Sequence, residues 1–251
     1  MAAISAAKIN EHGITLSSTK VPEGGNLDGG GDQEENIMTT LTLHYIFDPL
    51  CGWCYGAAPL LHAAQNIPDL ALVLHGGGMM SGPNRRQIDS QWRGYVMPHD
   101  KRIAELTGQT FGEAYFNHLL NDTSAIMDST PPIAAILAAE QLAGQGADML
   151  HHIQQAHYVE GRRIADTSVL TELATDMGLS RTAFINALNL AQVASAQHIA
   201  DSRALLARVH GHGFPTFVLQ DRQGKTTTLP TSQYYGDPIG WAEMLKSMLA
   251  H

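Results

Sequence analysis

The sequence predicts an α/β fold in which a long helical segment interrupts a core of strands. Patterns typical of buried strands occur within residues 40–74 and again within residues 216–229. Between them, residues 85–190 carry apolar side chains at helical spacing over helix-sized lengths. The third observation is the pair Cys51 and Cys54, which follows the first strand directly. α/β proteins commonly place their chemistry at the end of a strand in this way.

Size and charge narrow the range of functions. With 251 residues the chain holds one large domain or a core domain with an inserted one, because domains usually have about 100–200 residues. The net charge of −9 is dispersed, so we expect no binding to nucleic acid or to anionic membranes, which requires clustered lysine and arginine. No apolar run reaches the about 18 residues of a membrane span, and the N-terminus lacks the apolar stretch of a secretion signal. We therefore expect a cytoplasmic protein.

Residues 1–37 have the composition of a flexible N-terminal tail. They are polar, include a glycine-rich stretch and an acidic cluster, and show no sustained hydrophobic period. Met38 begins a different kind of sequence and is a candidate for the natural start of the protein.

The first strand is predicted at residues 40–47, TLTLHYIF, because this run is rich in β-branched and aromatic residues. Asp48 and Pro49 end it. A short second strand is predicted at 71–74, where an apolar run is followed by three glycines. A helix between these strands would complete a βαβ unit, whose two strands are parallel.

The segment between the two strands has apolar residues at helical spacing, including Leu60, Leu61 and Ala64. Cys51 then falls at or just before the first turn of this helix. Pro59 lies inside the pattern and predicts a kink, because proline supplies no N–H for the helix hydrogen bond.

The helical segment and the C-terminal part follow in order. Ser180 is a predicted N-cap ahead of Phe184 and Leu188, and a further helix is predicted at about 191–209. Strand patterns then return on both sides of a short turn-forming loop, which predicts an antiparallel hairpin. An amphipathic helix ends the chain. The ranges of these last three elements are 216–220, 226–229 and 239–249.

The Cys-Gly-Trp-Cys motif at 51–54 carries the chemistry. The thiolate is the reactive form of cysteine, and free N–H groups at a helix start stabilise it. We therefore expect Cys51 to be the exposed attacking thiol and Cys54, one turn further on, to be the partly buried resolving thiol.

Two other interpretations of the cysteine pair stay open on the residues alone. The pair is half of a zinc site, or the cysteines merely pack in the interior. Zinc usually takes four ligands, and with no second Cys-x-x-Cys pair only histidines would complete the set. We favour the redox interpretation, with no metal, because the motif sits in a βαβ unit.

The sequence resembles a known family at two distant places. The stretch HYIFDPLCGWCYGAAPLL, the helical segment and the stretch ARVHGHGFPTFVL are together similar to the DsbA-like thioredoxin-fold family. The likeness is strongest to its non-secreted members, which are described as protein-disulfide isomerases or FrnE-like oxidoreductases. It implies a thioredoxin-like fold (βαβ plus ββα) with an inserted all-helical domain. The thioredoxin-like domain would comprise residues 38–84 and 192–251, and the insertion residues 85–191.

The resemblance also implies roles for particular residues. Phe214, Pro215 and Thr216 match the family's cis-proline loop, so Pro215 would be cis and face the cysteines, and the loop would bind an extended substrate. From the residue type alone, Trp53 would shield the cysteine pair or offer substrate an aromatic surface, and packing within the helix is an equally good interpretation. From its place in the sequence we expect Asp48 to cap the following turn or helix, in preference to the alternative that it relays a proton to or from Cys54.

The motif departs from the best-known members of the family, and the departures bear on electron flow. Gly52 and Trp53 stand where those members have proline and histidine, and Phe214 stands where they have a small β-branched residue. The resemblance implies thiol or disulfide proteins or peptides as substrates, no cofactor beyond the redox-active cysteines, and glutathione or another thiol as electron partner. Two alternatives are a kappa-type glutathione transferase or isomerase, which carries serine at the position of Cys51, and a non-catalytic DsbA-like adaptor protein.

Overall fold

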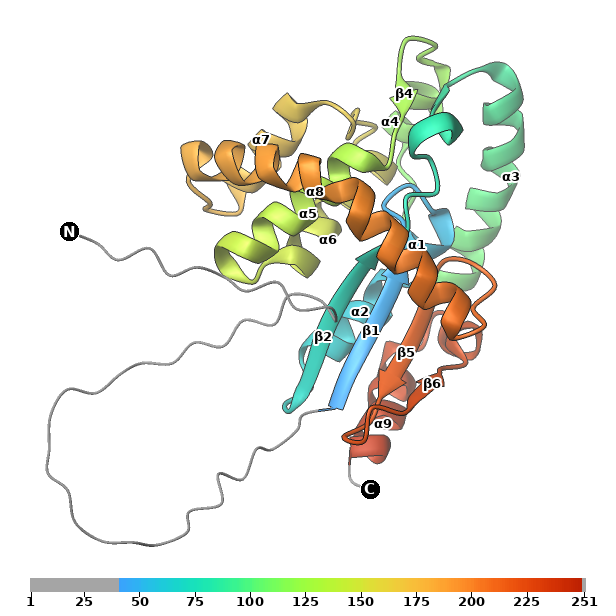
Figure 1. Ribbon diagram of the computed structural model, residues 1–251. Coiled ribbons are helices and arrows are strands. Elements are labelled where there is room, and N and C mark those ends of the chain that lie inside the picture. The colour runs from blue at the N-terminus through green and yellow to red at the C-terminus, as the bar shows by residue number, and fades with distance from the viewer. Residues whose placement is uncertain (1–40, 250–251) are drawn as a thin grey trace, which may run out of the picture. The chain divides into compact units, whose positions relative to one another are not determined.

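The structure is a computed structural model that describes residues 41–249, so the predicted tail at 1–37 lies outside the described residues. The chain runs through strands, α-helices and short 3₁₀ helices (η), as Figure 1 shows. In order the elements are β1 (Leu41–Phe47), α1 (Gly52–Gly56), α2 (Ala58–Gln65), β2 (Leu70–Gly76), η1 (Gly82–Asn84), β3 (Arg86–Gln87), α3 (Ser90–Thr107), α4 (Glu113–Asn117), η2 (Leu119–Asn121), β4 (Ile126–Met127), α5 (Thr130–Ala143), α6 (Gly146–Tyr158), α7 (Thr167–Asp176), α8 (Arg181–Arg208), β5 (Thr216–Gln220), β6 (Thr226–Thr228), η3 (Thr231–Tyr234) and α9 (Pro238–Leu249).

The main sheet has four strands in the order β2-β1-β5-β6. β1 pairs in parallel with β2 and antiparallel with β5, so Tyr45 lies between Leu74 and Phe217. β5 and β6 form the predicted antiparallel hairpin. The predicted βαβ unit and hairpin are both confirmed.

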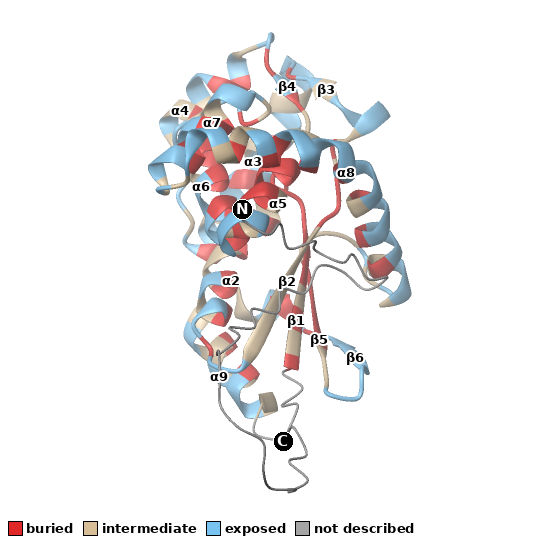
Figure 2. Ribbon diagram, turned by 60° about the vertical axis from the view of Figure 1, so that its left-hand side comes forward, coloured by how far each residue is buried: buried red, intermediate tan, exposed pale blue. Residues whose placement is uncertain are grey.

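Helices cover both faces of the main sheet. α2 and α9 lie on one face and the C-terminal half of α8 crosses the other, as Figures 1 and 2 show from two directions. On the first face Trp241 of α9 is fully buried with its ring edge against Phe217, and Phe217 stacks on Tyr45. These large side chains remove apolar surface from water at the middle of the sheet, and this burial favours folding.

The helical segment is centred on α5, whose buried side chains belong to the same core as those of β1. This helix is mostly buried along its length and packs against α8 and α6, and Figure 2 colours most of it as buried. Its alanines permit the close approach of neighbouring helices, since a small side chain lets two helix axes come near each other. Among the described helices, none has both the length and the hydropathy that crossing a bilayer requires.

Three local features differ from the sequence prediction. The two helices expected from Ser180 to residue 209 are one continuous helix, α8, because no glycine or proline interrupts it near residue 190. The predicted boundary between residues 191 and 192 therefore lies inside a helix. The helix does not kink at Pro59 as expected but is broken at Ala57, between α1 and α2. Pro59 occupies the second position of α2, where its missing N–H leaves no helix hydrogen bond unmade. The short ladder of β3 with β4 was not predicted.

The burial pattern of α8 yields a prediction for stability. Phe184 is fully buried, whereas Val193 of the same helix is 85% exposed. Replacing Phe184 with alanine leaves a cavity, so we expect Phe184→Ala to lower the free energy of unfolding by about 3–5 kcal/mol. The matched variant Val193→Ala should change it by less than about 0.5 kcal/mol. Urea unfolding of both variants checks this, and equal effects would contradict the packing of α8.

Candidate active site

The two cysteines lie at the C-terminal end of β1, where the chain turns into α1. Cys51 is the N-cap of α1, and its N–H donates to the carbonyl of Asp48 at 3.1 Å. Cys54 lies in the first turn of that helix. Both are free thiols. The predicted position of Cys51 just before the first helical turn is confirmed.

The expected exposure of Cys51 is wrong. Cys51 is only 8% exposed and Cys54 has no exposed surface, so both cysteines are buried. The reason is a loop that is distant in sequence: the Sγ of Cys51 donates to the carbonyl oxygen of Phe214 at 3.5 Å. The two thiols still differ, because Cys51 alone has a part of its surface in contact with solvent.

The loop that covers Cys51 contains a cis peptide bond between Phe214 and Pro215, as the resemblance implied. The ring of Phe214 lies against Gly77, where a Cβ would stand 2.0 Å from the ring. The hydroxyl of Thr216 donates to the carbonyl of Gly213 at 2.7 Å, so this side chain stabilises the loop. The arrangement turns the Phe214 carbonyl, and not its ring, toward Cys51.

Asp48 is fully buried directly before the cysteine turn. Its Oδ1 accepts from the N–H of Leu50 at 2.9 Å and from the hydroxyl of Ser129 at 2.9 Å, and its Oδ2 accepts from the N–H of Met79 at 2.5 Å. Burial raises the pKa of Asp48 to about 6, although these hydrogen bonds favour the ionised form and oppose that rise. Asp48 thus caps the turn before Cys51 and remains able to titrate near neutral pH.

Cys54 lies in surroundings that disfavour its thiolate. Burial raises its pKa well above the ordinary value, and the neighbouring Cys51 raises it further. The N–H of Asp48 donates to the Sγ of Cys54 at 3.5 Å and partly opposes this rise. These surroundings keep Cys54 protonated, as a resolving thiol requires before it is activated.

An aromatic pair stands beside the cysteines. The rings of Trp53 and Tyr235 have centroids 5.2 Å apart, and both side chains are partly buried. Burial raises the pKa of Tyr235, and the nearby Cys54 and Cys51 raise it further. Sequence reasoning missed Tyr235, because the segment between β6 and α9 carries no motif that points to the cysteines.

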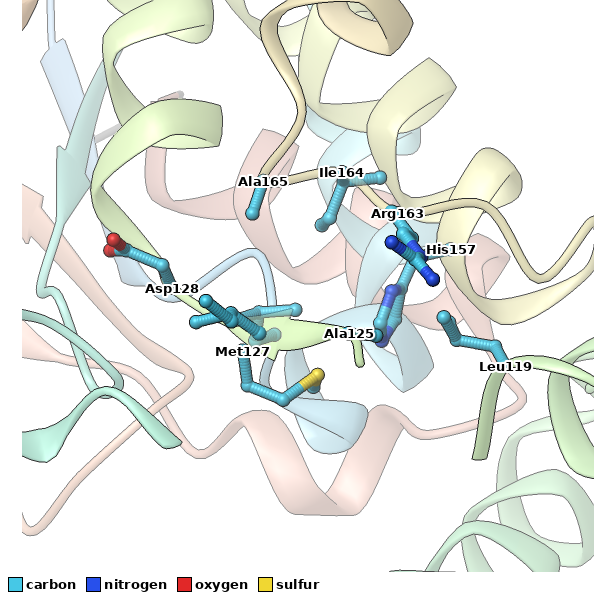
Figure 3. A pocket seen from close by; sticks show the side chains of 10 residues that line it. Leu119, Ala125, Met127, Asp128, His157, Arg163, Ile164 and Ala165 are labelled. Carbon is cyan, nitrogen blue, oxygen red and sulfur yellow. The ribbon is translucent and has the colours of Figure 1, made fainter. Parts of the chain in front are cut away.

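Two cavities lie outside the cysteine site. One of about 10 Å³, shown in Figure 3, is lined by Leu50, His157 and Arg163 among other residues. It has room for about one water molecule. The other, of about 170 Å³, lies between α2 and α6. Within residues 41–249, no three histidine, cysteine or acidic side chains are placed to hold a metal ion together.

The sequence matches the family model of the DSBA-like thioredoxin domain over residues 42–234. The chain belongs to this family. The match confirms the resemblance to the DsbA-like family that the sequence showed, and it confirms the predicted thioredoxin-like fold. No curated protein matches the sequence.

Solved structures agree with the family assignment. The cytosolic disulfide reductase DsbM from Pseudomonas aeruginosa is 52% identical to this DSBA-like chain, with 83% of this chain and 98% of DsbM covered and a TM-score of 0.79. A structure of DsbM with GSH gives 50% identity, coverage of 84% and 100%, and a TM-score of 0.78. A candidate protein disulfide isomerase from Nitrosomonas europaea shares the fold at 23% identity, with coverage of 84% and 98% and a TM-score of 0.68.

The different surroundings of the two thiols yield a prediction. We expect iodoacetamide to alkylate Cys51 much faster than Cys54 near neutral pH, because Cys54 has no exposed surface and burial raises its pKa. Peptide mapping of the reduced protein by mass spectrometry measures both rates, with Cys51→Ser and Cys54→Ser as single-thiol controls. Equal rates, or faster labelling of Cys54, would exclude the assigned roles.

Proposed function

We propose that this DsbA-like thiol-disulfide oxidoreductase works in the cytosol as a disulfide reductase that takes its electrons from glutathione. Cys51 is the attacking thiol and Cys54 the resolving thiol. The observation that carries the proposal is the 52% identity to the cytosolic disulfide reductase DsbM over 98% of that protein. The structure of DsbM with GSH supports glutathione as the thiol partner.

The proposed reaction moves two electrons and two protons to the substrate. The Cys51 thiolate attacks one sulfur of the substrate disulfide, and the other sulfur leaves as a thiolate and takes up a proton. Cys54 then loses its proton and attacks the Sγ of Cys51, which releases the second substrate thiol. Cys51 and Cys54 are left joined as a disulfide. One glutathione thiolate opens that disulfide to a mixed disulfide on Cys51, and a second removes it as oxidised glutathione.

Asp48 is the proposed base for the resolving step. Its N–H contacts the Sγ of Cys54, and its buried carboxyl has a pKa raised to about 6 by burial. Above this pH the carboxylate is ready to take a proton from Cys54, either directly or through a water molecule. The same carboxyl also shapes the turn before Cys51, so its positioning and chemical roles are compatible.

The substrate is proposed to lie between the cis-proline loop and the aromatic pair. The backbone of Phe214, beside Pro215, presents polar groups next to Cys51 and suits an extended chain that adds main-chain hydrogen bonds. Trp53 and Tyr235 offer an apolar wall next to the same sulfur. Thr216 contributes by holding the loop in place.

The dipeptide between the cysteines supports the reducing direction. A disulfide is strongly oxidising when the reduced form is stabilised, above all through the attacking thiolate. Gly52 and Trp53 supply no positive charge for that purpose. The pair therefore lacks one means of stabilising the thiolate, which favours donation of electrons to substrates.

Trapping of a mixed disulfide tests this function. We expect Cys54→Ser to accumulate a covalent adduct between Cys51 and glutathione when it is treated with oxidised glutathione, because no resolving thiol remains to displace it. Intact-protein mass spectrometry detects the adduct, and Cys51→Ser is the matched control that should form little. Wild-type protein should also couple glutathione oxidation to reduction of a disulfide peptide. No adduct and no turnover would favour the adaptor interpretation instead.

The role of Asp48 predicts a change in pH dependence. In the wild type the rate at which Cys54 resolves a preformed mixed disulfide on Cys51 should rise as pH increases through about 6, because Asp48 then becomes a base. Asp48→Asn should lose this rise and resolve roughly tenfold to hundredfold more slowly at neutral pH. Rapid-mixing measurements from pH 5 to pH 8 check this, with Asp128→Asn as the control. Matching profiles for the wild type and Asp48→Asn would exclude the base.

A further inference from the structure

A second buried carboxyl lies against the cysteine motif from the helical segment. Asp100 of α3 is 5% exposed, and its Oδ1 stands 2.7 Å from the point where a Cβ on Gly52 would be. Ile103 of the same helix approaches that point to 2.9 Å. Only glycine leaves room for this carboxyl next to the residue that follows Cys51.

The contact brings the carboxyl close to the attacking cysteine. Adjacent Cα atoms are about 3.8 Å apart, so the Oδ1 of Asp100 lies within roughly 8 Å of the Cα of Cys51. Over such a short separation inside a protein, water does not fully screen the repulsion between two like charges. A charge on Asp100 is therefore close enough to affect the stability of a thiolate on Cys51.

The surroundings of Asp100 leave it able to change charge. The hydroxyl of Tyr115 of α4 donates to its Oδ2 at 2.8 Å. Burial raises the pKa of Asp100 to about 7, and the Tyr115 hydrogen bond opposes this rise. Tyr158 of α6 is a further titratable group near Asp100, and it is also near both cysteines. Among the described residues no salt bridge holds Asp100 ionised.

We propose that Asp100 is a positioning residue whose charge state sets how readily the cysteine pair gives up electrons, an inference that rests on the proposed redox function of the pair. When Asp100 is ionised, its negative charge destabilises a thiolate on Cys51. The disulfide carries no charge and is not affected in this way. Ionised Asp100 therefore favours the oxidised pair, which makes the reduced pair a stronger reductant. When Asp100 is protonated, this effect disappears.

The direction of the effect agrees with a reductase. At and above neutral pH a growing fraction of Asp100 is ionised, and the pair then passes its electrons on more readily. The carboxyl comes from α3, which belongs to the helical segment and not to the strand-containing core. The helical segment thus contributes to the redox chemistry as well as to the cover over the core.

The test is the equilibrium constant between the cysteine pair and dithiothreitol, measured for the wild type and Asp100→Asn at pH 6 and pH 8. Asparagine keeps the size of the side chain and can still accept from Tyr115. At pH 8 we expect Asp100→Asn to hold the pair in the reduced form about fivefold more strongly than the wild type does. At pH 6, where Asp100 is mostly protonated, the two proteins should agree.

Two further variants keep the result interpretable. Tyr115→Phe removes the hydroxyl that favours the ionised carboxyl, so it should shift the wild-type transition to higher pH. It also provides a test if Asp100→Asn fails to fold. Glu105→Gln removes an exposed carboxylate from the same helix and should change nothing. An equal shift at both pH values, or no shift at pH 8, would overturn the proposal. Dithiothreitol replaces glutathione, so failure of glutathione as a partner would be seen separately in the trapping experiment.

Discussion

The structure around the cysteines depends on the buried carboxyl of Asp48. This one side chain accepts hydrogen bonds from the cysteine turn, from the loop after β2 and from the start of α5. A buried carboxyl without such partners would be costly, since burial without hydrogen bonds is unfavourable for any polar group and most of all for an ion. Each of the three donors therefore has to remain next to the carboxyl. One of them is the N–H of Leu50 in the cysteine turn, so the same requirement holds Cys51 in position.

The same constraint joins the helical segment to the strand-containing core. Ser129 immediately precedes α5, and its hydroxyl also accepts from the N–H of Met80 at 3.0 Å. Arg203 of α8 donates to the carbonyls of Gly77 and Gly78 in the same loop, at 2.8 and 2.5 Å. The loop after β2 is thus held from three sides. It in turn supports the ring of Phe214, whose carbonyl covers Cys51.

Covering Cys51 has a chemical consequence. A fully exposed thiol would react with any disulfide or oxidant that collides with it, whereas Cys51 presents only a small part of its surface beside a backbone carbonyl and an aromatic pair. In the proposed function, a substrate reaches the sulfur by lying along the cis-proline loop. Residues near 214 limit access to Cys51, whereas the buried acidic groups next to the cysteine motif, Asp48 and Asp100, come from other parts of the chain.

Side-chain periodicity and neighbours in the chain were enough to predict the strands of the main sheet, most helices and the place of Cys51 at a helix start. The resemblance added the cis-proline loop. Folding of the whole chain was needed to bring Ser129 to Asp48, 81 residues away, and to place the Phe214 carbonyl over Cys51 across 163 residues. Such contacts leave no pattern in the local sequence, because the identity of an aspartate or of any other residue does not show which distant partner its carboxyl or carbonyl will contact. The Asp100 carboxyl lies near the cysteine motif because α3 packs against α1, and this packing forms only when the chain folds.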